Sequence, residues 1–330
     1  MKLGIVGTGL IVETLFQFIS EIKEIEVKAI CSTINSKNKM INMAETNHIE
    51  NRYTDYDLFL KDTSFDTVYV AIPNNLHYSY SKKALLAGKN VICEKPFTTN
   101  HKQALALADL ALEKHLFLIE AISNIYTANY QKIKELLPTL GDIKIVSLNY
   151  TQYSSRYDLF KQGIIKPAFN INCSGGALMD LNVYNIHFVT GLFGQPQNVY
   201  YYPNIERDID TSGILIMDYD DFKVTSIAAK DCGAPLLNAI EGNKGCIYFE
   251  TAINKLSEFS YQLNKQEAQH FAFNSNDHRM KAEFIKFADM IDNDLYDECK
   301  KQLDHSLAVM SILTQARVSA DLRFPDDANI

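Results

Sequence analysis

Short apolar runs alternate with helix-like segments through the first third of the chain, and this alternation restricts the possible folds more than any other feature. The apolar runs occupy residues 2–6, 26–31, 66–72, 90–93 and 116–119. Segments with helical character lie between them at 10–22, 78–87 and 100–114. Strands that alternate with helices of this length form βαβ units, in which helices cover both faces of a parallel sheet. We therefore predict an α/β domain with a parallel sheet over residues 1–122.

From about residue 143 the pattern changes to longer strands joined by tight turns. Residues 143–152, 212–217, 222–229 and 246–251 are predicted strands, with turns at 218–221 and 241–245. Consecutive strands joined in this way form an antiparallel sheet. We predict an α+β domain over residues 123–330 with an open, mainly antiparallel sheet. A helix is expected near 177–192, and C-terminal helices at 279–320 are expected to pack back.

Composition excludes several classes of partner. The 330 residues include 32 Lys and Arg against 40 Asp and Glu, a net charge of -8 that argues against nucleic acid. No run approaches 18 uncharged apolar residues, so no membrane partner is expected. Six scattered cysteines without a C-x-x-C pair predict neither a metal site nor a disulfide scaffold, and the protein is expected in the cytoplasm. A second copy would cover the open sheet, so we expect a homo-oligomer, either a dimer or a dimer of dimers.

The turn after the first predicted strand contains two glycines. This segment, Gly7-Thr8-Gly9-Leu10-Ile11-Val12, opens the first predicted helix, which is the context in which a Gly-x-Gly turn binds dinucleotides. Gly7 permits a tight turn, and Gly9 lets the backbone approach a pyrophosphate. Val12 stands where Gly or Ala is usual, so strand and helix should pack less closely there. Gly-Thr-Gly also forms ordinary turns, but its place in a βαβ series favours nucleotide binding. The predicted cofactor contacts are Gly7, Thr8, Gly9, Leu10 and Ile11.

The end of the second predicted strand bears on cofactor choice. An acidic residue there would bind the ribose hydroxyls of NAD and repel the 2′-phosphate of NADP. The segment 31–37 has no acidic residue but contains Ser32, Thr33 and Lys37. These three residues favour NADP as cofactor. The alternative, nearly as well supported, is that they are plain loop residues and that NAD binds without selective contact.

Two polar clusters are candidates for catalysis. Glu94 and Lys95 end the strand at 90–93, and ligands of parallel sheets bind beyond the carboxyl ends of strands. Asp180, Tyr184 and His187 would share one face of the predicted helix at 177–192. Each cluster also has a structural explanation. Glu94 and Lys95 could be a solvated ion pair, and the tyrosine and histidine could be core residues with satisfied polar atoms.

These segments together resemble the glucose–fructose oxidoreductase, inositol dehydrogenase and rhizopine-catabolism (Gfo/Idh/MocA) family. The resemblance runs almost end to end. It rests on GTG at 7–9, VAIPNNLH at 70–77, AGKNVICEKP at 87–96, GGALMD at 175–180, LFGQP at 192–196 and EGNKG at 241–245. It implies a Rossmann domain followed by a substrate domain with a large open sheet, commonly dimeric. It also implies NAD(P)-dependent oxidation or reduction of a sugar, a polyol or a related carbonyl compound.

The resemblance also assigns residues. Lys95 matches the catalytic lysine and Asp180 the carboxylate beside the substrate. Pro73, Asn74 and His77 match the loop on the nicotinamide side, and Glu94 and Lys95 are grouped with the cofactor contacts. Many members have histidine at the position of Tyr184. Tyrosine there resembles the dihydrodiol dehydrogenase, xylose dehydrogenase and glucose–fructose oxidoreductase branches, and it weakens an inositol dehydrogenase assignment. Asn182 replaces a usual glycine.

Hydride transfer to or from nicotinamide requires one proton to move at the substrate oxygen. We hypothesise that Tyr184 exchanges this proton, that Lys95 stabilises tyrosinate and hydrogen-bonds the substrate, and that Asp180 orients Lys95 or a substrate hydroxyl. In an equally tenable version Lys95 donates the proton and Tyr184 positions the substrate. The predicted substrate contacts are Lys95, Asp180, Tyr184 and His187. Two alternatives stay open: a non-catalytic dinucleotide sensor of the same fold, and a reductase of non-sugar carbonyls such as diketones or dihydrodiols.

Overall fold

A computed structural model describes residues 1–274 and 277–327. The chain divides into two compact units, one of residues 1–121 with 280–307 and the other of residues 122–279 with 308–330. The boundary at residue 122 stays a prediction for the domain division. Residues 280–307, which we assigned to the second domain, group with the first unit because α9 (Lys281–Asp292) and the start of α10 (Tyr296–Ser319) pack on its core.

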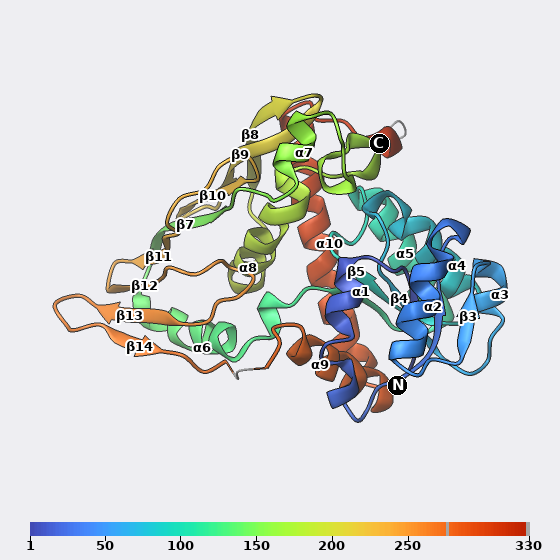
Figure 1. Ribbon diagram of the computed structural model, residues 1–330. Coiled ribbons are helices and arrows are strands. Elements are labelled where there is room, and N and C mark those ends of the chain that lie inside the picture. Colours follow the sequence, from blue (N-terminus) through green and yellow to red (C-terminus); the bar gives the residue numbers. More distant parts are fainter. Residues whose placement is uncertain (275–276, 328–330) are drawn as a thin grey trace. The chain divides into compact units, whose positions relative to one another are not determined.

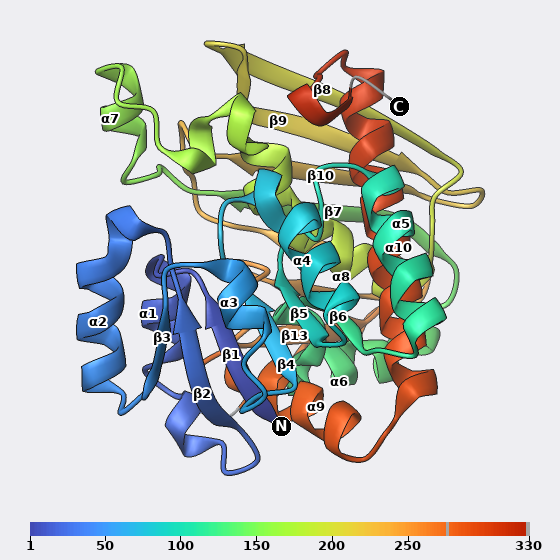
Figure 2. The ribbon, with the colours of Figure 1, turned by 90° about the vertical axis from the view of Figure 1, so that its right-hand side faces the viewer.

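The first unit is built on a parallel sheet, as predicted (Figures 1 and 2). The sheet has the order β3-β2-β1-β4-β5-β6, and every strand pair in it is parallel. This is the strand order of a doubly wound dinucleotide-binding fold. Its strands are β1 (Lys2–Val6), β2 (Glu26–Cys31), β3 (Asn51–Tyr53), β4 (Thr67–Val70), β5 (Asn90–Glu94) and β6 (Leu118–Ala121). The short polar β3 has no apolar run and was not predicted.

Helices cover this sheet, and α4 and α5 pack side by side across it in Figure 2. The helices are α1 (Leu10–Leu15), α2 (Lys37–Thr46), α3 (Tyr56–Leu60), α4 (His77–Leu86) and α5 (His101–Lys114). The helix predicted at 10–22 is wrong in its length, because α1 ends at Leu15 and Ile19–Glu21 forms a separate 3₁₀ turn. The apolar periodicity still predicts burial correctly, because Phe18 is buried edge-on against Phe284 of α9.

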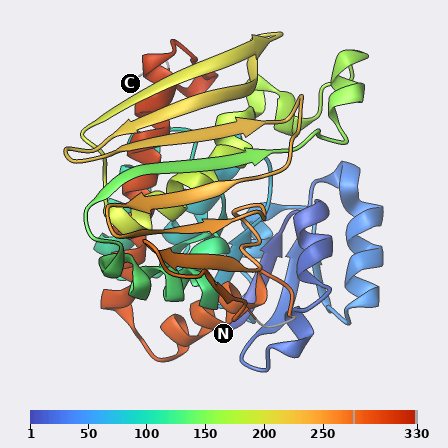
Figure 3. The ribbon, with the colours of Figure 1, turned by 90° about the vertical axis from the view of Figure 1, so that its left-hand side faces the viewer.

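The second unit is built on a sheet of order β14-β13-β12-β11-β7-β10-β9-β8 (Figure 3). It is mainly antiparallel as predicted, but β7 and β10 pair in parallel. The strands are β7 (Ile143–Thr151), β8 (Asn198–Glu206), β9 (Ile209–Asp218), β10 (Lys223–Ala229), β11 (Asn238–Gly242), β12 (Gly245–Phe249), β13 (Phe259–Leu263) and β14 (Gln269–Phe271). The strand β8 was not predicted, and it contains Pro203, which an edge strand tolerates.

One face of this sheet carries α6 (Ala128–Leu136), α8 (Val183–Phe193) and the end of α10, which lie behind it in Figure 3. The short helix α7 (Tyr157–Lys161) lies in the connection between β7 and α8. The opposite face has exposed apolar and aromatic side chains. Tyr202 of β8 is 64 % exposed and pairs in register with Ile214 of β9, which is 43 % exposed.

Candidate active site

The glycine turn of the first unit has two different structural requirements. Gly7 has φ +121°, and a Cβ added there would lie 2.0 Å from the carbonyl oxygen of Ala71, so only glycine fits. At Gly9, by contrast, an added Cβ would meet nothing within 4 Å. The protein itself therefore does not require glycine at position 9. Open space at the carboxyl end of β1 fits a dinucleotide phosphate that approaches the backbone there.

The predicted residues at the end of β2 lie together. Ser32 is buried and its hydroxyl donates to the carbonyl oxygen of Thr33 at 3.1 Å. Thr33 is exposed, and so is Lys37 at the start of α2. Leu10 and Ile34 are also exposed, by 61 % and 65 %. This edge of the sheet thus presents the Thr33 hydroxyl, an ammonium group and apolar surface.

The strand end at β5 exposes one polar side chain selectively. Residues 91–100 are all buried except Lys95, which is half-buried. Glu94 accepts a hydrogen bond from the Tyr69 hydroxyl, and Glu120 accepts one from the Phe97 amide at 2.9 Å. Burial, with Glu94 beside it, raises the pKa of Tyr69. Glu94 is therefore an internal support, which contradicts the solvated-pair interpretation and leaves Lys95 as the residue that can face a ligand.

His77 also acts from inside the first unit. It has no exposed surface, and its ring nitrogens lie 2.9 Å from the carbonyl oxygens of Ile72 and Pro96. Burial lowers the pKa of His77. The side chain joins the loop after β4, which contains Pro73 and Asn74, to the loop that contains Lys95. The structure thus places His77 where it supports both loops from the interior.

In the second unit, Asp180 lies in a π-helical turn (Leu178–Asn182) that precedes α8, where we predicted one regular helix. Such turns are frequent at functional sites. Gly176 before it has φ +104°, and a Cβ there would lie 1.9 Å from Asp210 Oδ1. Asp210 is fully buried and accepts hydrogen bonds from the Leu178 amide and the Tyr201 hydroxyl, both at 2.7 Å. Burial raises the pKa of Asp210 to about 6.

The three predicted polar residues of this region have unequal exposure. The Asp180 side chain is 29 % exposed, Tyr184 is 7 % exposed, and His187 is fully buried. The Tyr184 carbonyl oxygen accepts a hydrogen bond from Asn124 Nδ2 at 2.9 Å. Asp180 and Tyr184 therefore retain surface for a ligand. The burial of His187 is that of a core residue, which was the alternative to a role in substrate binding.

Some functional supports escaped the sequence analysis. Lys230 forms an ion pair with Asp180 at 2.7 Å, and Asn182 accepts hydrogen bonds from Ser226 and Asn185. In the sequence, the only sign of Lys230 was that a lysine directly follows the apolar end of β10. Asn182 was noted only because it replaces a usual glycine, and the structure shows that its buried side chain binds Ser226 of β10.

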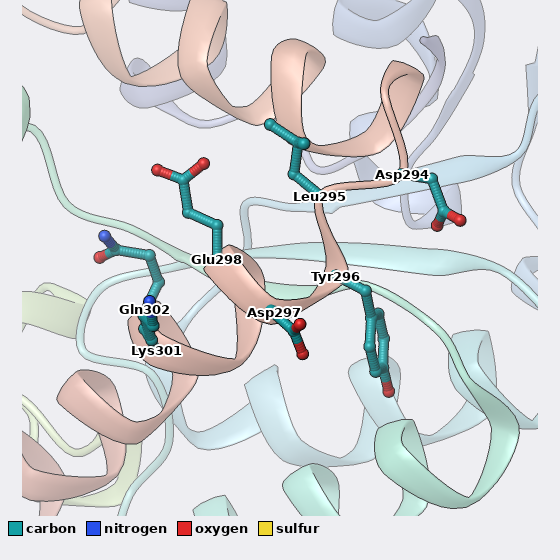
Figure 4. A pocket seen from close by; sticks show the side chains of 7 residues that line it. All are labelled: Asp294, Leu295, Tyr296, Asp297, Glu298, Lys301 and Gln302. Carbon is teal, nitrogen blue, oxygen red and sulfur yellow. The ribbon is translucent and has the colours of Figure 1, made fainter.

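The hollow in Figure 4 lies at the connection of α9 and α10 in the first unit and contains no predicted site residue. It is lined by Asp294, Leu295, Tyr296, Asp297, Glu298, Lys301 and Gln302. Nowhere in residues 1–274 or 277–327 do three or more His, Cys, Asp or Glu side chains gather in a way that could hold a metal ion. Within the same ranges, no helix is long and apolar enough to span a membrane.

Comparisons with known proteins agree with the resemblance noted in the sequence. Residues 1–122 match the family described as "Oxidoreductase family, NAD-binding Rossmann fold". The chain is 26 % identical to scyllo-inositol 2-dehydrogenase (NADP(+)) of Bacillus subtilis, over 99 % of both chains. It is 32 % identical to D-xylose 1-dehydrogenase (NADP(+)) of Hypocrea jecorina, over 57 % of this chain and 52 % of the relative.

The fold has solved counterparts. A 3-ketoreductase from Actinomadura kijaniata, solved with TDP-benzene and NADP, superposes with a TM-score of 0.82 at 20 % identity, and the match covers 97 % of each chain. The first 122 residues thus match the NAD-binding Rossmann domain of the Gfo/Idh/MocA oxidoreductase family, and over its whole length the chain is similar to an NADP(+)-dependent dehydrogenase.

Proposed function

We propose that this oxidoreductase moves a hydride between NADP and a hydroxyl or carbonyl carbon of a sugar, a polyol or a related compound. The observation that carries the proposal is the selective exposure of Lys95 at the end of β5, in a unit whose Gly9 leaves open space for a dinucleotide. The names of the relatives from Bacillus subtilis and Hypocrea jecorina, one an inositol and the other a xylose dehydrogenase, support the substrate class.

NADP is favoured over NAD by the residues at the end of β2. Ser32, Thr33 and Lys37 supply hydroxyls and a positive charge for a 2′-phosphate, and no carboxylate in residues 31–37 would repel it. Both of those relatives are named as NADP(+) enzymes. When bound, the nicotinamide supplies or accepts the hydride. Gly7, Thr8, Gly9, Leu10 and Ile11 hold the dinucleotide, with Pro73 and Asn74 on the nicotinamide side.

The chain's own residues move one proton at the substrate oxygen. Tyr184 exchanges it, because an ammonium group such as Lys95 favours tyrosinate, and Lys95 also hydrogen-bonds the oxygen. Asp180 orients Lys95 or a substrate hydroxyl. In a second version, Lys95 donates the proton and Tyr184 positions the substrate. The variants Tyr184→Phe and Lys95→Met distinguish the two versions. His187 has no exposed surface and therefore acts on a substrate only through its neighbours.

The non-catalytic sensor has no support among the relatives named above, which are dehydrogenases and a reductase. A reductase of non-sugar carbonyls remains the second candidate, and one observation favours it. The chain is 28 % identical to trans-1,2-dihydrobenzene-1,2-diol dehydrogenase of Xenopus tropicalis over 74 % of each chain.

We further propose that the enzyme works as a dimer, or a dimer of dimers, through the exposed face of its second sheet. Tyr200, Tyr202 and Ile214 are each more than 40 % exposed there, and a second copy would remove this surface from water. The cytoplasm is the proposed compartment, because all six cysteines are free thiols and a reducing environment keeps them so.

The test is a fluorescence titration of the purified protein with NADPH and NADH, followed by turnover assays with aldoses, inositols and dihydrodiols. NADPH binding that is at least tenfold tighter than NADH binding, with turnover of an aldose or inositol, is expected. Turnover of dihydrodiols alone would favour the second candidate. Tight binding without any turnover would contradict the catalytic proposal, and the absence of nucleotide binding would contradict the role of the glycine turn.

A further inference from the structure

A buried lysine lies directly behind the carboxylate of Asp180. Lys230 is 2 % exposed, and its ammonium group pairs with Asp180 Oδ2 at 2.7 Å. It also donates to the carbonyl oxygen of Ala168 and lies 4.4 Å from the ring centre of Phe169. A buried ammonium ion is costly unless it is paired and hydrogen-bonded. These three contacts meet this requirement.

The same strand offers a comparison for this ion pair. Lys223, at the opposite end of β10, also pairs with a carboxylate at 2.7 Å, that of Asp218. Its side chain is 58 % exposed, against 2 % for Lys230. Exposed pairs contribute little to stability, whereas breaking a buried pair leaves an uncompensated charge. The burial of Lys230, and not the ion pair alone, is therefore the unusual feature.

A second tie joins the same two elements. Ser226 of β10 lies four positions before Lys230, the residue that follows this strand, so both side chains project to the same side of the extended backbone. The Ser226 hydroxyl donates to Asn182 Oδ1. Asn182 and Asp180 both belong to the π-helical turn. The strand therefore holds this turn at two points, one neutral and one charged. Asp210 of β9 accepts a hydrogen bond from the amide of Leu178, the first residue of the same turn.

We propose that Lys230 is a positioning residue, which favours the anionic form of Asp180, fixes the direction of its carboxylate and couples it to the loop at Ala168. This inference rests on the proposed function and deepens it. A carboxylate held as an anion accepts hydrogen bonds and donates none, so Asp180 orients its partner and the proton moves through Lys95 or Tyr184. The loop contact means that a change in the backbone at Ala168 also shifts the carboxylate.

The first test follows the charge of Asp180 without turnover. In protein labelled with ¹³C at aspartate carboxyl carbons, the Asp180 signal is assigned by its loss in Asp180→Asn and followed with pH. Replacing Lys230 by methionine should raise the titration midpoint by about one pH unit or more. Lys230→Arg should keep the wild-type midpoint, and so should the control Lys223→Met. Asp210 interacts electrostatically with Lys230, and Tyr201 interacts with Asp210 and Asp231, so Asp210→Asn is included to separate the Asp210 signal. Equal midpoints in wild type and Lys230→Met would overturn the proposal.

The second test is a double-variant cycle on turnover. Lys230→Met should lower kcat/KM by roughly 10- to 100-fold while the Kd for NADPH stays within about twofold, because a misplaced group affects chemistry more than cofactor binding. In an Asp180→Asn background the same change should cost less than about threefold. An equal loss in both backgrounds would overturn the proposal. Unfolding midpoints identify a variant that fails to fold, for which Lys230→Arg then decides. A wild type without turnover would refute the proposed function, while the carboxyl titration still decides the role of Lys230.

Discussion

The two glycines of the turn after β1 should respond in opposite ways to the same substitution. Gly9→Ala adds a methyl group where nothing lies within 4 Å, at an ordinary φ of -73°. Its unfolding free energy should stay within about 0.5 kcal/mol of wild type, or rise by up to about 1 kcal/mol, since alanine restricts the unfolded chain. The same methyl group occupies the space we assign to the dinucleotide. NADPH binding should therefore weaken at least about tenfold, which corresponds to about 1.4 kcal/mol.

Gly7→Ala should destabilise the fold itself. Its φ of +121° costs a residue with a side chain about 1–3 kcal/mol, and the Cβ would lie 2.0 Å from the backbone oxygen of Ala71. Relief of that overlap costs about a further 1–3 kcal/mol, so a total of about 2–6 kcal/mol is expected. Denaturant unfolding measures both variants, and fluorescence titration measures NADPH binding by Gly9→Ala. Wild-type NADPH affinity in Gly9→Ala would refute our placement of the cofactor, and wild-type stability in Gly7→Ala would refute the steric argument.

Further predictions concern the proton, one buried acid and the oligomer. Tyr184→Phe should lower kcat about 10²- to 10⁴-fold if Tyr184 exchanges the proton, and Lys95→Met should then shift the pH–rate profile toward higher pH; unchanged turnover in Tyr184→Phe assigns the proton to Lys95. Because burial raises the pKa of Asp210 from an ordinary 3.8 to about 6, the folded chain binds a proton that the unfolded chain has already lost. Stability should fall by about 3 kcal/mol between pH of about 4 and 6, and denaturant midpoints of Asp210→Asn should lack this fall. Tyr202→Glu combined with Ile214→Glu should give a monomer by light scattering at unchanged NADPH affinity, and an unchanged mass would count against the sheet interface.

The parts of the fold that follow from local pattern were predictable from the sequence. Strands such as β1 and β5 are continuous apolar runs bounded by glycine or proline, so their positions and their parallel pairing could be inferred. The helix predicted at 10–22 ends at Leu15, and Phe18 beyond it is buried against Phe284 of α9, which lies more than 260 residues away in the sequence. Periodicity shows that a residue is buried but not which distant element buries it.

The residues of the candidate site also fall into those that the sequence could predict and those that it could not. Lys95 and Asp180 could be proposed because each follows a recognisable local feature, a strand end and a glycine-rich turn. Lys230 could not, because its role depends on β10 lying against a turn that is 50 residues earlier in the chain. His77 illustrates a different limit. The motif around it was noticed, but only the structure shows that both ring nitrogens face carbonyl oxygens of the protein.

Each proposed catalytic residue is held by a buried polar side chain from another element. A ring nitrogen of His77 lies 2.9 Å from the carbonyl oxygen of Pro96, the residue after Lys95. Lys230 pairs with Asp180, and Asn124 donates to the carbonyl oxygen of Tyr184. Supports of this kind fix the direction of a reacting group before substrate arrives. Because they have no exposed surface or almost none, they cannot select the substrate. We therefore expect substitutions at the supports to lower kcat for every substrate alike, whereas preference among sugars, polyols and diols should change only with exposed residues.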